Sequence, residues 1–290
     1  MTIIALLAQW YFLVYKILLH HQLVPVLSIK SVFFLGLSFA LVMAAGYIMN
    51  DIADIEIDKI NKEGKQIMGK QISVNKAWFY YVAINIVAAG LSISLAIKYQ
   101  KTQLLILLPI AVIGLYLYSK LFKKTAFWGN LLIAVLCSLV IWMPYFAELE
   151  IIRMLSTELN SLIFFRFIFC SSIGGLLTFT RELVKDLEDI KGDSLLLAKT
   201  APVQFGIPFT HKIIAGLMIL NFILILGSIF FFYLSMLQTL VICLSMAAPG
   251  IIILFLILQR EKPDYHLISM GLKSIMASGM LLLPWALSNV

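Results

Sequence analysis

Two acidic stretches stand out in an otherwise apolar chain: NDIADIEID at residues 50–58 and RELVKDLEDIKGD at residues 181–193. Each holds an aspartate triplet with the spacing D-x2-D-x3-D, namely Asp51, Asp54 and Asp58, then Asp186, Asp189 and Asp193. Grouped carboxylates repel one another and need cations to offset the repulsion. Their hard oxygen atoms suit Mg²⁺, Mn²⁺ or Ca²⁺ better than soft metals. These aspartates are therefore candidate metal ligands.

The spacing also predicts how the carboxylates are arranged. At about 100° per residue, offsets of three and seven place each triplet within about 60° on one face of a helix. Glu56 and Glu188 point away from their triplets. Neither acidic stretch contains His or Cys, which argues against zinc. Mg²⁺ binds through one or two carboxylates together with substrate phosphates, so two clusters would hold two ions bridged by a diphosphate. Solvated loop acids are the alternative, disfavoured because two clusters share one spacing.

Basic residues lie beside both acidic stretches and in the connection near residues 120–124. We expect some of them to neutralise the phosphate oxygens of the ligand. The candidates for diphosphate binding are Lys62, Lys65, Lys120, Lys123, Arg181 and Lys185. For any single lysine, a signal for membrane topology is the competing interpretation.

The elements that must position these residues are membrane helices. The chain has 290 residues, of which 62% are hydrophobic and 13% charged, against about 25% charged in soluble proteins. Segments of roughly 20 apolar residues predict nine transmembrane helices, at about 2–19, 30–49, 77–97, 103–119, 127–147, 161–180, 212–233, 237–258 and 267–287. The runs do not alternate as barrel strands do. The sequence thus predicts an all-α polytopic membrane protein with one membrane-embedded domain, 1–290.

The acidic stretches follow the second and sixth predicted helices, so they share one membrane face. Most of the 22 basic residues fall on that face, which the positive-inside rule places in the cytoplasm. The N-terminus is then cytoplasmic and the C-terminus lies outside. Topology accounts for the net charge of +7, so no nucleic-acid partner is expected.

A diphosphate with a long apolar tail fits both the charged ends of the predicted helices and their apolar interior. Ionising its allylic C–O bond leaves negative charge on the diphosphate, which Mg²⁺ stabilises as a Lewis acid. The allylic carbocation must then be kept from water and close to an acceptor.

The motifs resemble those of a known family. NDIADIEIDKINK resembles the first motif, N-D-x2-D-x3-D, of the UbiA-type intramembrane prenyltransferases, and KDLEDIKGD is similar to their second, D-x3-D. The pattern R-E-x2-K-D-x-E-D-x2-G-D is most similar to the branch of geranylgeranylglyceryl-phosphate geranylgeranyltransferases. YSKLFKKTAFWGN, residues 118–130, resembles that branch's loop after its fourth helix.

The resemblance implies nine helices around a central cavity, with cytoplasmic helical caps, in a bacterial or archaeal cell membrane. It implies Mg²⁺-dependent transfer of a long, geranylgeranyl-like prenyl group from a prenyl diphosphate to a lipophilic acceptor such as a glycerol-phosphate lipid. The residues implied to bind Mg²⁺–diphosphate are Asp51, Asp54, Asp58, Asp189 and Asp193. Asp186 stands one helical turn earlier, and Asn50 would position the first metal site.

The chain also departs from the family pattern. Residues 61–66 read NKEGKQ where N-[KR]-P-x-R-P is usual, so both prolines are missing and Lys65 stands where arginine is common. A terpene cyclase of the same superfamily, in which the cation attacks its own double bond, is therefore an alternative. An aromatic or quinone-precursor prenyltransferase is a further one. A transporter is disfavoured, because its charges would lie at mid-helix depth.

Overall fold

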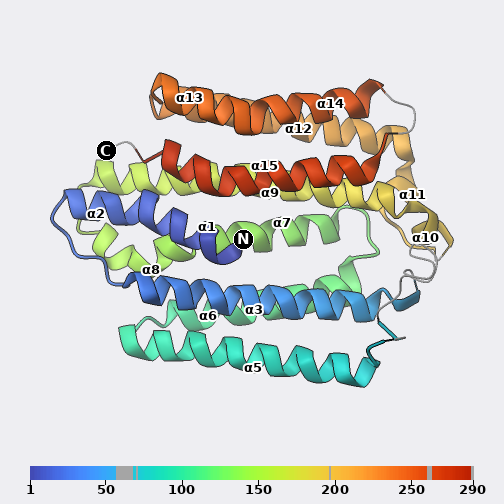
Figure 1. Cartoon of the computed structure of the whole chain (residues 1–290), viewed down its shortest axis with the longest axis horizontal. Helices are drawn as coiled ribbons and strands as arrows, with labels where there is room; N and C mark the ends of the chain where they lie inside the picture. Colours follow the sequence, from blue (N-terminus) through green and yellow to red (C-terminus); the bar gives the residue numbers. More distant parts are fainter. Residues whose placement is uncertain (57–67, 70, 196, 260–262, 289–290) are drawn as a thin grey trace.

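The computed structural model describes residues 1–56, 68–69, 71–195, 197–259 and 263–288. They form a bundle of long helices that lie side by side and run across the view from left to right (Figure 1). Within the described residues, β-structure is limited to two isolated bridges, Met68 with Ile72 and Thr125 with Lys199. In the part of the chain that the structure describes, eight spans are long and apolar enough to cross a membrane, or nine if one bent pair counts as a single span. The predicted all-α polytopic membrane fold is confirmed.

The helices follow the predicted segments closely. The first four spans are α1, η1 and α2 (Thr2–Gln9, Trp10–Tyr15, Lys16–His20), α3 (Ile29–Ala53), α5 (Val74–Tyr99), and α6 with η2 (Gln103–Leu117, Tyr118–Phe122). After them come α7 (Trp128–Ile141), α8 (Met143–Ile152), α9 (Thr157–Glu188), α10 (Ile190–Leu195), α11 (Ala201–Phe205), α12 (Ile207–Phe231), α13, η3 and α14 (Met236–Ile242, Cys243–Ala247, Ala248–Gln259), and α15 (Tyr265–Ala286). The segments η1, η2 and η3 are π-helical.

The fifth predicted helix, 127–147, is broken rather than continuous. Its two parts, α7 and α8, meet at Trp142 with a bend of 40°. Pro144 in the first turn of α8 explains the break, because its ring lacks an N–H and clashes with the carbonyl one turn earlier.

Helices α3 and α9 carry the two acidic stretches. Each begins with a serine whose hydroxyl accepts a backbone N–H, Ser28 from Ser31 and Ser156 from Leu159, which satisfies an otherwise unpaired donor. The C-terminal ends of α3 and α9 lie at the same end of the bundle, where the short helices α10 and α11 also lie (Figure 1). The acids of the two stretches therefore meet at one end of the molecule.

The core is centred on α9, which packs against α7, α12 and α15. A second apolar cluster joins α3 to α1, α5 and α6. Helices α7 and α9 approach closely at Gly175, where an added Cβ would lie 2.6 Å from the hydroxyl of Ser138. This close approach sets the spacing between the start of α7 and the end of α9, where the candidate site lies.

Candidate active site

Both aspartate triplets straddle a helix break at their middle residue. Helix α3 ends at Ala53 with Asp54 as its C-cap (φ −93°, ψ 2°), and α9 ends at Glu188 with Asp189 as its C-cap (φ −92°, ψ 3°). Residues in this sparsely populated backbone region occur often at active sites. For the second triplet, the expectation of one continuous helical face is therefore wrong, because the chain turns at Asp189 between α9 and α10. Asp58 of the first triplet lies outside the described residues.

Asp54 is at the centre of a buried polar network. Its carboxylate Oδ2 accepts a hydrogen bond from Asn50 Nδ2 at 2.9 Å and forms an ion pair with Lys123. The Lys123 ammonium also donates to Asn50 Oδ1 at 2.9 Å. The other carboxylate oxygen, Oδ1, is buried and has no hydrogen-bond partner among the described residues. Asp54 thus presents one oxygen that is held and one that is available to a cation.

Two aspartates of the second triplet are held in the same manner by neutral donors from other elements. Asn130 on α7 donates to Asp186 Oδ2 at 2.8 Å. Thr200, just before α11, donates from its hydroxyl to Asp193 Oδ2 at 3.1 Å. A single neutral donor orients a carboxylate and supplies no compensating positive charge.

The charges of Asp54, Lys123, Asp189 and Asp193 influence one another. Burial raises the pKa of Asp189 to about 6; the charge of Lys123 opposes this rise and the charge of Asp193 adds to it. Burial also raises the pKa of Asp193, which Lys123 lowers and Asp54 raises. Desolvated carboxylates that raise one another's pKa are short of positive charge, which a divalent cation would supply.

The π-helical segment η2 explains why Lys123 points into the site. The Lys123 N–H donates to the carbonyl of Tyr118 at 2.8 Å, five residues back, instead of four as in an α-helix. The extra residue in this turn rotates Lys123 towards the acids, whereas Lys120 on the same segment is exposed.

The connection between η2 and α7 is fastened on both sides. The Lys199 N–H donates to the Lys124 carbonyl at 2.9 Å, which ties this connection to the segment before Thr200. Gly129 packs against the Phe122 carbonyl, where an added Cβ would lie only 2.6 Å away. The chain can therefore fold back here and place Lys123 and Asn130 beside the acids.

Arg181 and Lys185 share a buried acidic partner. Glu182 Oε1 accepts from Arg181 Nη1 at 2.8 Å, and Glu182 Oε2 lies 3.5 Å from Lys185 Nζ. The Tyr118 hydroxyl donates to Glu182 Oε2 at 3.4 Å. Glu182 thus holds both basic residues, and of the two Lys185 lies close enough to Asp186 to lower its pKa.

The sequence-predicted residues are distributed as follows. The structure brings together Asn50, Asp54, Lys123, Lys185, Asp186, Asp189 and Asp193, and it pairs Arg181 with Glu182. Asp51 and Lys120 are exposed. Asp58, Lys62 and Lys65 lie outside the described residues. The partners that sequence reasoning missed are Tyr118, Asn130, Glu182 and Thr200; only their proximity in sequence to the motifs pointed to them.

The residues present fit a divalent cation. Helix C-termini carry partial negative charge, so acids at the ends of α3 and α9 are unfavourable until a cation neutralises them. The unpartnered Asp54 Oδ1 supplies a hard oxygen ligand. Within the described residues, no group of three or more acidic, His or Cys side chains is already arranged to hold a metal ion.

Replacing Asn130 with alanine tests the role of the neutral donors. We expect Asn130→Ala to raise the Mg²⁺ concentration needed for half-maximal turnover about tenfold. Groups that orient metal-binding carboxylates affect metal affinity by this order. Mg²⁺ titrations of turnover and of thermal stability measure the change. Asn85→Ala is the control, since Asn85 donates to the Tyr81 carbonyl within α5. Equal Mg²⁺ titrations for both variants would contradict the assignment.

A helical membrane bundle that brings two acidic helix ends and a lysine together at one end is the arrangement of an intramembrane prenyltransferase. A sequence profile of the UbiA prenyltransferase family matches residues 6–271, and the chain belongs to this family.

Relatives and solved structures agree with this assignment. Digeranylgeranylglyceryl phosphate synthase of Saccharolobus solfataricus is 36% identical over 201 residues, which are 68% of this chain and 65% of that protein. A solved structure of a digeranylgeranylglyceryl phosphate synthase has a TM-score of 0.63 at 23% identity, over 99% of this chain and 91% of the other. The UbiA homologue of Archaeoglobus fulgidus bound to GPP and Mg²⁺ has a TM-score of 0.57 at 20% identity, over both whole chains. These structures show the shared fold.

Proposed function

We propose that this chain is a Mg²⁺-dependent prenyltransferase of a prokaryotic membrane, which moves a geranylgeranyl-like group from a prenyl diphosphate to a glycerol-phosphate lipid. The name of the Saccharolobus relative supports the acceptor class, and the ligands of the Archaeoglobus homologue support the donor and the metal. The observation that carries the proposal is the site at which Asp54, Lys123, Asp189 and Asp193 come together from four separate elements, α3, η2, α9 and α10.

The residues fit the chemistry of this transfer. The C–O bond between the allylic carbon and the diphosphate breaks, a new C–O bond forms to the acceptor hydroxyl, and the hydroxyl proton is released. Lys123 lies where it can donate to the departing phosphate oxygens, and Asn50 holds it there. Bound Mg²⁺ would be held by Asp54, Asp186, Asp189 and Asp193, with Asp51 and Asp58, and would supply Lewis-acid stabilisation of the leaving group. The apolar helices keep water from the carbocation.

Purified protein incubated with Mg²⁺ and geranylgeranyl diphosphate, with and without a glycerol-phosphate lipid, tests the proposal. We expect diphosphate release and a new ether lipid only when the acceptor is present. A cyclic hydrocarbon or alcohol formed without acceptor would identify a terpene cyclase instead. A product formed only with an aromatic acceptor would identify the quinone-precursor class. No diphosphate release with any donor would reject all three.

We further propose that 1–290 is one membrane-embedded domain whose acidic end faces the cytoplasm. The native Cys137, Cys170 and Cys243 are first replaced by serine, and a single cysteine is introduced at one of two exposed positions. Lys191→Cys lies at the acidic end, and Tyr233→Cys lies in the connection at the opposite end. An impermeant maleimide applied to intact cells should label Tyr233→Cys and spare Lys191→Cys. The reverse pattern would overturn the orientation.

A further inference from the structure

A small apolar cavity lies inside the bundle, among α1, α7, α9, η3 and α15. We call it the central cavity; its volume is about 30 Å³. Its wall includes two glycines, Gly174 and Gly279, and three methionines, Met246, Met276 and Met280. At this volume it has no room for a prenyl chain unless side chains move. Methionine is the apolar side chain best suited to such movement, because it is unbranched and has three rotatable bonds.

The central cavity lies at the depth that the end of a prenyl tail would reach. Along α9, its lining residues Leu177 and Cys170 are about 14 and 24 Å from Asp186 at the helical rise of 1.5 Å per residue. An extended isoprene unit contributes four C–C bonds of about 1.5 Å and spans roughly 5 Å. On this scale the fourth unit spans about 15–20 Å and lies inside the cavity, and the fifth spans about 20–25 Å and reaches its far end at Cys170.

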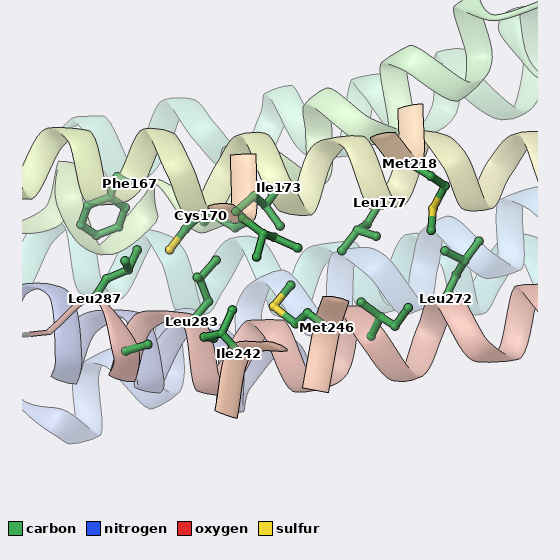
Figure 2. Close-up of a cluster of buried hydrophobic side chains, with 14 of the residues drawn as sticks. Phe167, Cys170, Ile173, Leu177, Met218, Ile242, Met246, Leu272, Leu283 and Leu287 are labelled. Carbon is green, nitrogen blue, oxygen red and sulfur yellow. The ribbon is translucent and has the colours of Figure 1, made fainter. Parts of the chain in front are cut away.

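A second cavity, the lateral cavity, lies beside the central cavity on the side of α12. Its volume is about 10 Å³, and it is lined from α12 by Met218, Asn221 and Phe222. Leu177 and Met246 line both cavities and so form the partition between them. Figure 2 shows the Met246 side chain in the layer between α9 and α15.

The position of Met246 depends on two local features. It comes from the π-helical segment η3, in which the extra residue alters the direction of the side chains. It also lies against Gly279 of α15, where an added Cβ would be 2.7 Å from Met246 Cε and 3.3 Å from its Sδ. The absence of a side chain at Gly279 thus leaves the space that the end of Met246 occupies.

We propose that Met246 sets the length of the prenyl tail that this chain accepts, by closing the partition between the central and lateral cavities. The inference rests on the proposed function for the kind of ligand, and it adds the residue that decides ligand size. Shortening Met246 joins the two cavities and admits a longer tail. A methyl group at Gly279 pushes the thioether into the central cavity and shortens the tail that fits.

Binding of prenyl diphosphates of 10, 15, 20 and 25 carbons, measured with Mg²⁺ by thermal shift, tests the proposal without requiring turnover. We expect Met246→Ala to raise the affinity for 25 carbons relative to 20 carbons about tenfold, as expected for burying about two further methylene groups. Gly279→Ala should lower the affinity for 20 carbons relative to 15 carbons.

Two further variants keep the test sharp. Met246→Leu conserves side-chain volume and should keep the wild-type ratios, which separates loss of the partition from a general loss of packing. Met236→Ala removes a methionine that is 89% exposed on the same span, and should also keep them. Unchanged ratios in Met246→Ala and Gly279→Ala would overturn the inference even if prenyl transfer is observed. Altered ratios without any transfer product would instead support it and reject the proposed function.

Discussion

Asp54→Ala and Asp189→Ala are each expected to lower turnover of geranylgeranyl diphosphate by on the order of 10³-fold, while the protein stays folded. Both aspartates occupy the C-cap of a helix that ends at the site. Removing either carboxylate takes away negative charge that would hold the cation against the departing diphosphate. Diphosphate release under saturating donor measures the loss, and size-exclusion profiles with thermal unfolding confirm the fold.

The matched controls are the glutamates next to these aspartates. Glu56→Ala and Glu188→Ala remove a carboxylate two residues and one residue away, and both side chains are exposed. Glu188 pairs with His266 at 2.9 Å, outside the aspartate cluster. We expect turnover within about threefold of wild type for both controls, in the range of surface substitutions. Normal turnover in Asp54→Ala or Asp189→Ala would reject a metal site built from two clusters.

Lys123→Met is expected to lower kcat/KM for the prenyl diphosphate about 10²-fold, the order seen when one charge-stabilising donor is removed. Lys123 contacts Asp54 and Asn50 of the first triplet and lowers the pKa of Asp189 and Asp193 in the second. It is therefore a cation that contacts the first cluster and also acts on the second, to which Lys185 and Lys124 contribute as well. Steady-state kinetics and the affinity for inorganic diphosphate measure the effect. Lys123→Arg keeps the charge and should recover part of the loss.

Lys120→Met is the matched control, because Lys120 lies three residues earlier on the same π-helical segment and is exposed. We expect its kcat/KM to stay within about threefold of wild type. If Lys120→Met were the more damaging substitution, the inward orientation of Lys123 would be wrong, and with it the role given to the π turn.

The amino-acid sequence by itself determined the class of fold and the location of the site. A lipid environment requires every backbone polar group to be paired within the chain. Long continuous runs of apolar residues therefore specify helices, but they do not specify how those helices pack. Among the described residues, eight predicted segments match a helical span closely and the fifth is broken between α7 and α8. The aspartate triplets follow such runs in the sequence, and the structure places Asp54 and Asp189 at the ends of α3 and α9.

Only the tertiary structure decided how the site residues meet. Asn130 pairs with Asp186, which is 56 positions away in the sequence, and Lys123 pairs with Asp54, which is 69 positions away. No local periodicity encodes such contacts. The choice between Lys120 and Lys123 depended on one π turn, which a constant 100° per residue cannot anticipate. The helix breaks at Asp54 and Asp189 are likewise features of backbone geometry. Spacing specified which residues are available, and packing between distant helices specified which of them touch.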